Sequence, residues 1–135
     1  EAIEIYSKVL KTNPIDEAAL CGLALVYQTD GKMDKTIDAY KKALQVNPSF
    51  FVANYNLAIV YANTNQIDDA IVHFNKAIDL NNGDATIYNN LGVLYFKKNR
   101  HDDAKICFER ALLIDAHYKE AQQNLKKVSK VFEKV

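Results

Sequence analysis

The sequence predicts an all-α protein made of antiparallel helix pairs, and three observations support that prediction. Leucines recur every 34 residues, at Leu23, Leu57, Leu91 and Leu125, and such a period marks a repeat architecture. Apolar residues around them recur at positions i, i+3 and i+4, which is the spacing of one helix face. Glycine and proline number only 4 and 2, which leaves little of the turn chemistry that a sheet-rich fold needs.

The first half of each unit is expected to form one helix. Leu91, Leu94 and Tyr95 have the i, i+3, i+4 spacing of its buried face. The position after the repeated leucine holds a small residue in three units, and we expect it to let a neighbouring helix approach closely. These small residues are Ala24, Ala58 and Gly92.

A turn and a second helix complete the unit. The turn position holds Gly31, Asn65 or Asn99, the residue types that best tolerate a left-handed helix C-cap. Each is followed by an aspartate three residues later, where a carboxylate stabilises the start of the second helix. In that helix, alanine and aromatic columns recur at helical spacing, as in Ala104 and Phe108. Prolines at positions 14 and 48 close two units.

These columns resemble the tetratricopeptide repeat family, whose 34-residue pattern places an aromatic, Leu-Gly, Tyr, Ala, Phe, Ala and Pro at fixed offsets. The resemblance implies an all-α, right-handed α-solenoid of antiparallel helix pairs in a single domain. Its expected parts are the second helix of a truncated repeat at 1–16, complete repeats at 17–50, 51–84 and 85–118, and a capping helix at 119–135. The opening aromatic position departs from the pattern twice, because it holds Leu20 and Asn54 before Tyr88.

The last unit is expected to end the array. Lys126 occupies the small-residue position and would block a following helix. One apolar face remains, with most of the lysines off it, as in the solvating caps that terminal repeats require. The face consists of Ala121, Leu125, Val128 and Phe132.

Composition limits the possible partners. Lys+Arg and Asp+Glu both total 17, whereas proteins that bind duplex nucleic acid usually carry a basic excess. No apolar run approaches the roughly 18 residues of a membrane span. Cys21 and Cys107 lie far apart and are expected to be buried thiols, which favours a cytoplasmic protein. We therefore expect no nucleic-acid partner and no direct membrane insertion.

Motifs for catalysis or metal binding are not found. His73, His101 and His117 fall at unrelated repeat positions, and no pair of them sits at ligand spacing with Cys or carboxylates. The acidic pair after His101 occupies the same slot as the pair at 68–69, so charge at a helix start explains both. No phosphate loop and no nucleophile with a base can be assembled from spacing. We expect no enzyme activity, no cofactor and no metal.

The resemblance implies a concave binding face lined by the first helix of each pair. The expected ligand is an extended or helical segment of a partner protein. The residues expected to contact it are Leu25, Tyr55, Asn56, Ile59, Asn63, Asn89, Asn90, Val93, Phe96, Lys97 and Asn124.

Some family members bind the acidic C-terminal tails of cytosolic chaperones through a clamp for two carboxylates. The clamp needs Lys and Asn on one helix, Asn on the next, and Lys and Arg on a third. In this chain the clamp positions of one register hold Cys21, Leu25, Asn56, Thr86 and Asn90, and those of the next hold Tyr55, Ile59, Asn90, Glu120 and Asn124. Only asparagine is retained, and without cations the desolvation of the carboxylates is not offset. Chaperone tails are therefore not expected as ligands.

An asparagine column remains, formed by Asn56, Asn90 and Asn124. A carboxamide offers both donors and an acceptor, so it can pair with a peptide backbone. The column is similar to the asparagine ladder in the tetratricopeptide domain of the enzyme that attaches N-acetylglucosamine to Ser and Thr. Asparagine is also common at this offset in the family, and it could equally bond a neighbouring helix or loop.

Three functions are compatible with the sequence. The first is a non-catalytic interaction module or scaffold that holds a segment of a partner. The second is a self-assembling, homo-oligomeric scaffold in which one copy occupies the groove of another. The third is the substrate-recognition domain of a larger enzyme.

Overall fold

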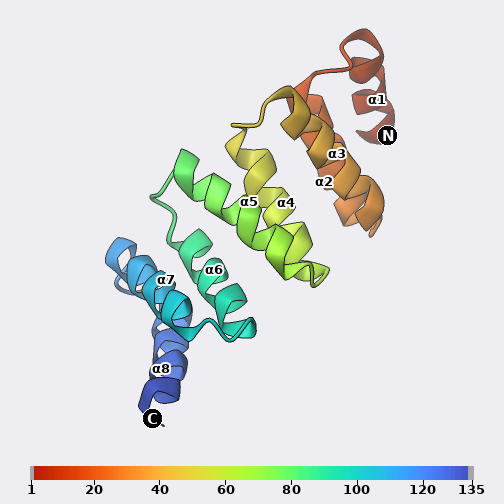
Figure 1. Ribbon diagram of the computed structural model, residues 1–135. Coiled ribbons are helices and arrows are strands. Elements are labelled where there is room, and N and C mark those ends of the chain that lie inside the picture. Colours follow the sequence, from red (N-terminus) through yellow and green to blue (C-terminus); the bar gives the residue numbers. More distant parts are fainter. Residues whose placement is uncertain (1, 134–135) are drawn as a thin grey trace. The chain divides into compact units, whose positions relative to one another are not determined.

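The computed structural model describes residues 2–133, which form eight helices and no strand (Figure 1). This confirms the predicted all-α fold of helix pairs. The helices are α1 (Ala2–Thr12), α2 (Glu17–Thr29), α3 (Met33–Val46), α4 (Phe51–Asn63), α5 (Ile67–Leu80), α6 (Ala85–Lys97), α7 (His101–Ile114) and α8 (Lys119–Glu133). Residues 134 and 135, at the end of the predicted capping helix, lie outside the described part.

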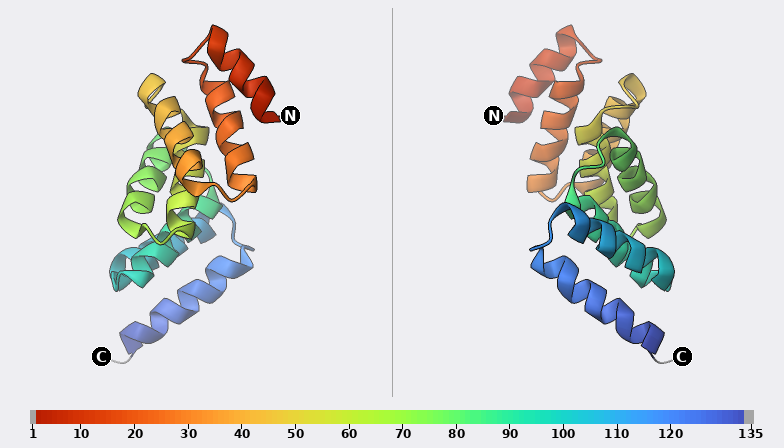
Figure 2. Two further views of the ribbon diagram at one scale, coloured as in Figure 1. Left: turned by 90° about the vertical axis from the view of Figure 1, so that its right-hand side faces the viewer. Right: turned by 90° about the vertical axis from the view of Figure 1, so that its left-hand side faces the viewer.

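The chain separates into two compact units, unit 1 at Glu1–Leu80 and unit 2 at Asn81–Val135. Within unit 1, each of the helices α1 to α5 packs against the next one. Within unit 2, α6 packs against α7, and α8 packs against α7 and also contacts α6 (Figure 2). The expectation of a single domain over all 135 residues stays a prediction.

Each complete helix pair turns at a residue in the left-handed region of backbone space. The φ angles are 76° at Gly31, 61° at Asn65 and 60° at Asn99, as predicted from the residue types. The backbone N–H of Gln66 donates to the Tyr61 carbonyl at 2.8 Å, and the other two turns contain the equivalent bond. These bonds satisfy carbonyls at the end of the first helix.

Each unit has a core in which small and aromatic residues alternate. In unit 1, Tyr40 and Phe74 are buried, and alanines such as Ala43 and Ala70 have no exposed surface. In unit 2, Gly92 packs directly on the ring of Phe108, and a Cβ atom at this position would overlap that ring. The small residue after the repeated leucine thus allows close helix packing, as predicted.

Helix α8 contributes the apolar face that the sequence predicts. Ala121 and Val128 are fully buried, and Leu125 packs against the cluster around Phe108. Phe132 lies at the edge of this face, 39% exposed, with the Lys105 Nζ atom 5.5 Å from its ring centroid.

Candidate functional site

The residues predicted to contact a partner lie on α2, α4, α6 and α8. Asn89 is buried, with 3% of its surface exposed, which leaves a partner little of it to contact. The half-buried residues are Tyr55, Asn56, Ile59, Asn90, Val93, Phe96 and Asn124, and the exposed residues are Leu25, Asn63 and Lys97.

Four of these residues line a cavity of about 160 Å³ in unit 2, here called the α6–α8 pocket. Its lining residues are Val93, Phe96 and Lys97 of α6, Phe108 of α7, and Asn124 and Lys127 of α8. Phe108 is buried and Val93 and Phe96 are half-buried, whereas both lysines are exposed. The pocket therefore has an apolar wall and cationic groups nearer to solvent.

The size of the α6–α8 pocket limits what it can hold. A cavity of about 150 Å³ lined by apolar side chains holds one benzene, and pockets for drug-sized ligands usually exceed about 300 Å³. At about 160 Å³, the α6–α8 pocket has room for one large side chain and not for a cofactor.

The asparagines of unit 2 differ in their hydrogen bonds. Asn124 Nδ2 donates to Asn89 Oδ1 at 3.0 Å, and Asn89 Nδ2 donates to the Tyr118 hydroxyl at 3.5 Å. This chain of bonds links α6 to α8, while Asn124 keeps its acceptor oxygen and one N–H. The half-buried side chain of Asn90 makes no hydrogen bond to any residue that the structure describes.

In unit 1, Asn56 has a polar neighbour in the core. The Tyr40 hydroxyl of α3 is buried and makes no hydrogen bond of good geometry within the described residues. Burial raises the pKa of Tyr40 to about 12, the Cys21 thiol adds to this rise, and the Asn56 carboxamide opposes it. Asn56 therefore lies beside a buried polar group of unit 1, the Tyr40 hydroxyl.

The sequence pattern did not predict a polar pair between the buried Asn54 and the half-buried His73. Asn54 has no exposed surface, and its Nδ2 donates to the carbonyls of Pro48 at 3.1 Å and Phe50 at 3.2 Å. Its Oδ1 lies 3.1 Å from His73 Nδ1, so the imidazole must donate from that nitrogen. Burial, followed by the charge of Lys76, lowers the pKa of His73. The only signal in the sequence was the asparagine at an aromatic repeat position.

The two thiols are buried and unpaired with each other, as predicted. Burial raises the pKa of both Cys21 and Cys107 to about 11, and the carboxylates of Glu17 and Asp103, respectively, add to the rise. Reactive thiolates are consequently not expected at neutral pH. Within residues 2–133, no three His, Cys, Asp or Glu residues gather as a metal site would require. No described helix combines the length and apolar character needed to cross a membrane.

Three family models match this sequence. A tetratricopeptide repeat model matches residues 17–50 and 85–118, a second tetratricopeptide repeat model matches 39–72, and a TPR repeat model matches 63–99. The chain belongs to the tetratricopeptide repeat family. Proteins of this family are in general non-catalytic interaction modules. No curated protein matches the sequence.

Solved structures share the fold over most of the chain. A crystal structure of MamA is 27% identical with a TM-score of 0.88, covering 95% of this chain and 70% of MamA. The first TPR domain of Spaghetti (RPAP3), bound to the HSP90 peptide SRMEEVD, is 27% identical with a TM-score of 0.80, covering 87% of this chain and 93% of that domain. YrrB, described as a TPR protein with an unusual peptide-binding site, has a TM-score of 0.84 at 21% identity over 93% of this chain and 65% of YrrB.

Proposed function

We propose that this chain is a non-catalytic protein-interaction module that binds an extended segment of a partner protein. The observation that carries the proposal is the α6–α8 pocket, which is lined by Val93, Phe96, Lys97 and Asn124 on the faces expected to contact a partner. The peptide-bound domain of Spaghetti (RPAP3) supports the proposal, because it shows a related array binding a short segment. The unpaired thiols suit the cytoplasm, which we propose as the compartment.

Within the asparagine column, Asn90 and Asn124 are the proposed readers of the ligand backbone. Asn90 has no competing hydrogen bond within the described residues, and Asn124 keeps part of its capacity. Each carboxamide bond to a peptide would stabilise the complex by about 0.5–1.5 kcal/mol. Affinity is consequently expected to be modest, with apolar side chains supplying much of the rest.

Chaperone tails are proposed not to bind through a two-carboxylate clamp. The clamp positions that should be cationic hold Cys21, Thr86 and Glu120 among others, and Cys21 is buried. A terminal carboxylate therefore has no cation at those positions. If the peptide SRMEEVD binds at all, amidation of its C-terminus should change its affinity less than twofold.

Selection of displayed peptides on the immobilised chain tests the proposal, with affinities then measured by fluorescence anisotropy. Selected peptides should lose affinity on Asn90→Ala, while helicity by circular dichroism stays the same. Asn82→Ala, in the exposed loop before α6, is the matched control. If no peptide is enriched, the interaction module is wrong. If Asn90→Ala binds the selected peptides equally well, only the proposal that asparagine reads the ligand backbone fails.

A self-assembling scaffold is the second candidate, and the charge distribution favours it. Unit 1 holds 7 lysine and arginine residues against 10 aspartate and glutamate residues, whereas unit 2 holds 10 against 7. Unit 1 of one copy could therefore attract unit 2 of another. Light scattering over a concentration series separates the candidates, because only self-assembly predicts growth in mass without a partner and its reversal by salt.

A further inference from the structure

We propose that the α6–α8 pocket binds one large apolar side chain flanked by a carboxylate, within an internal acidic segment of a partner protein. This inference rests on the proposed function and names the chemistry of its ligand. The ligand needs no free terminus, because the groups that would recognise it surround a side-chain pocket.

The apolar requirement follows from the walls of the pocket. Phe108 is held in the core, 2% exposed, by packing on Gly92 and Val128. The Phe96 ring is held by an edge contact with His101, with ring centroids 5.0 Å apart. These aromatic walls are therefore formed before a ligand arrives. A preformed apolar cavity of this size suits a leucine, methionine or phenylalanine side chain.

The requirement for an acidic ligand follows from two lysines at the pocket. Lys97 of α6 and Lys127 of α8 both line the pocket, and neither forms an ion pair with any residue in the described part of the chain. Among the described residues, none that lines the pocket is acidic. Glu120, one turn before Asn124 on α8, is not among the lining residues. A carboxylate beside the bound side chain would meet an ammonium group from α6 or α8.

The charge of the whole unit favours the same ligand. Ten basic against seven acidic residues leave unit 2 with a formal excess of three positive charges. The net charge of zero for the entire chain conceals this excess, since unit 1 carries the opposite balance. An acidic segment would be attracted to unit 2 before any contact forms, and salt would weaken that attraction.

Asn124 would orient the ligand backbone next to the apolar ligand side chain that enters the pocket. Its bond to Asn89 fixes the carboxamide at the pocket wall and leaves Oδ1 and one N–H available. A peptide N–H or C=O adjacent to the ligand residue in the pocket can pair with these atoms. The arrangement differs from the two-carboxylate clamp, because neither Lys97 nor Lys127 occupies a clamp position.

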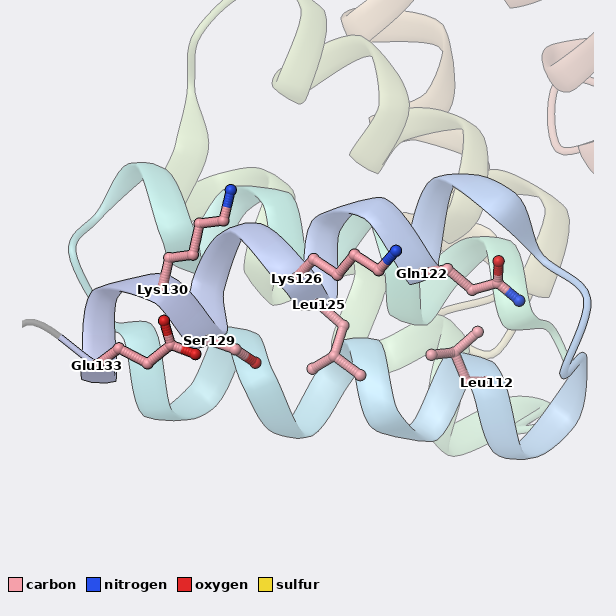
Figure 3. A pocket seen from close by; sticks show the side chains of 7 residues that line it. All are labelled: Leu112, Gln122, Leu125, Lys126, Ser129, Lys130 and Glu133. Carbon is pink, nitrogen blue, oxygen red and sulfur yellow. The ribbon is translucent and has the colours of Figure 1, made fainter.

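A second hollow in unit 2 provides the matched control. A cleft of about 500 Å³ between α7 and α8 is lined by Lys126 and Lys130, together with Leu112 and Leu125 (Figure 3). Its lining also includes the acidic Glu133, unlike that of the α6–α8 pocket. Replacing Lys126 and Lys130 removes as much charge from unit 2 as replacing Lys97 and Lys127.

The experiment is an NMR titration of the ¹⁵N-labelled chain with a nine-residue peptide. The peptide carries a central leucine flanked by two glutamates, and both of its ends are blocked. We expect saturable shifts centred on the amides of Val93, Phe96 and Asn124. Replacing the peptide glutamates with glutamines, or its leucine with alanine, should weaken binding at least tenfold.

Two variants of the protein give the decisive contrast. Lys97→Gln with Lys127→Gln should weaken binding at least tenfold, whereas Lys126→Gln with Lys130→Gln should change it less than threefold. Val93→Phe, which fills the pocket from its half-buried wall, should also weaken binding at least tenfold. Melting curves measured alongside establish that each variant is folded.

Several results would overturn the inference. Equal losses in both lysine pairs would indicate attraction by net charge alone, and shifts centred on Leu112 and Ser129 would place binding in the α7–α8 cleft. Self-association that is lost on Lys97→Gln with Lys127→Gln would make a second copy the occupant. If selected peptides bind elsewhere and depend on Asn90, this inference fails while the proposed function stands; if no peptide binds, both fail.

Discussion

Units 1 and 2 are built from the same repeat, yet they use its polar positions differently. In unit 1 the polar groups turn inward, as in the pair of the buried Asn54 with His73 and in Asn56 beside Tyr40. In unit 2 the corresponding aromatic position holds Tyr88. Asn89 is buried and bonded to Asn124, but Asn90, the remaining polar atoms of Asn124 and the lysines stay available near the surface. The position of a polar residue in the repeat therefore does not determine its role. Its role depends on the residues that surround it.

The largest expected effect comes from breaking the inward polar pair of unit 1. Asn54→Ala removes the donor to two carbonyls and the acceptor for the N–H of the half-buried His73 imidazole. An unsatisfied polar group costs about 1–3 kcal/mol when buried. Because His73 is only half-buried, we expect a loss of roughly 1–2 kcal/mol in the free energy of unfolding. Urea denaturation measures it. A loss below about 0.5 kcal/mol would show that the pair is not structural.

The second prediction compares two glycines that both touch an aromatic ring. Gly92→Ala forces a Cβ against the buried Phe108 ring, and overpacking costs about 1–3 kcal/mol against a helix-propensity gain of about 1 kcal/mol. Gly22→Ala meets only the outer end of the half-buried Tyr6 ring on α1, which can move away. We expect a net loss of about 1 kcal/mol in unit 2 and a gain of up to about 1 kcal/mol in unit 1. If this distinction is wrong, thermal denaturation would show stability changes of the same sign in the two variants.

The third prediction separates two asparagines of the same column. Asn90→Ala should weaken binding of a selected peptide about two- to tenfold, the equivalent of one hydrogen bond, with no change in stability. Asn56→Ala should lower stability, because it removes the polar neighbour of the buried Tyr40 hydroxyl. Anisotropy and urea denaturation on both variants give the comparison. Identical behaviour would mean that the column acts as a single ladder.

The sequence predicted the helix pairs and their turns because these depend on local patterns. A 34-residue period specifies which residues face the core, and the choice of Gly or Asn specifies the left-handed turn, as Gly31 and Asn65 show. Hydrogen bonds such as those of Asn89 with Asn124 and of Asn54 with His73 join residues 35 and 19 positions apart. They depend on packing between helices, which periodicity does not describe. The α6–α8 pocket is lined by residues from three helices. The sequence did not predict it for the same reason.

The smallest expected effect is a pH dependence confined to unit 1. The pKa of His73 is lowered in the folded chain by burial first and by Lys76 second, so the unfolded chain binds a proton more readily. Stability from this group is fully present above the ordinary pKa of about 6.5 and is lost as the pH falls through the folded value. Urea midpoints should decline between pH 7.5 and pH 5, and His73→Gln should flatten part of the decline relative to His117→Gln, an exposed histidine of unit 2. If the urea midpoint falls equally steeply with pH in both variants, the titrating group is not His73. The inward polar pair would then not distinguish unit 1 in its response to acid.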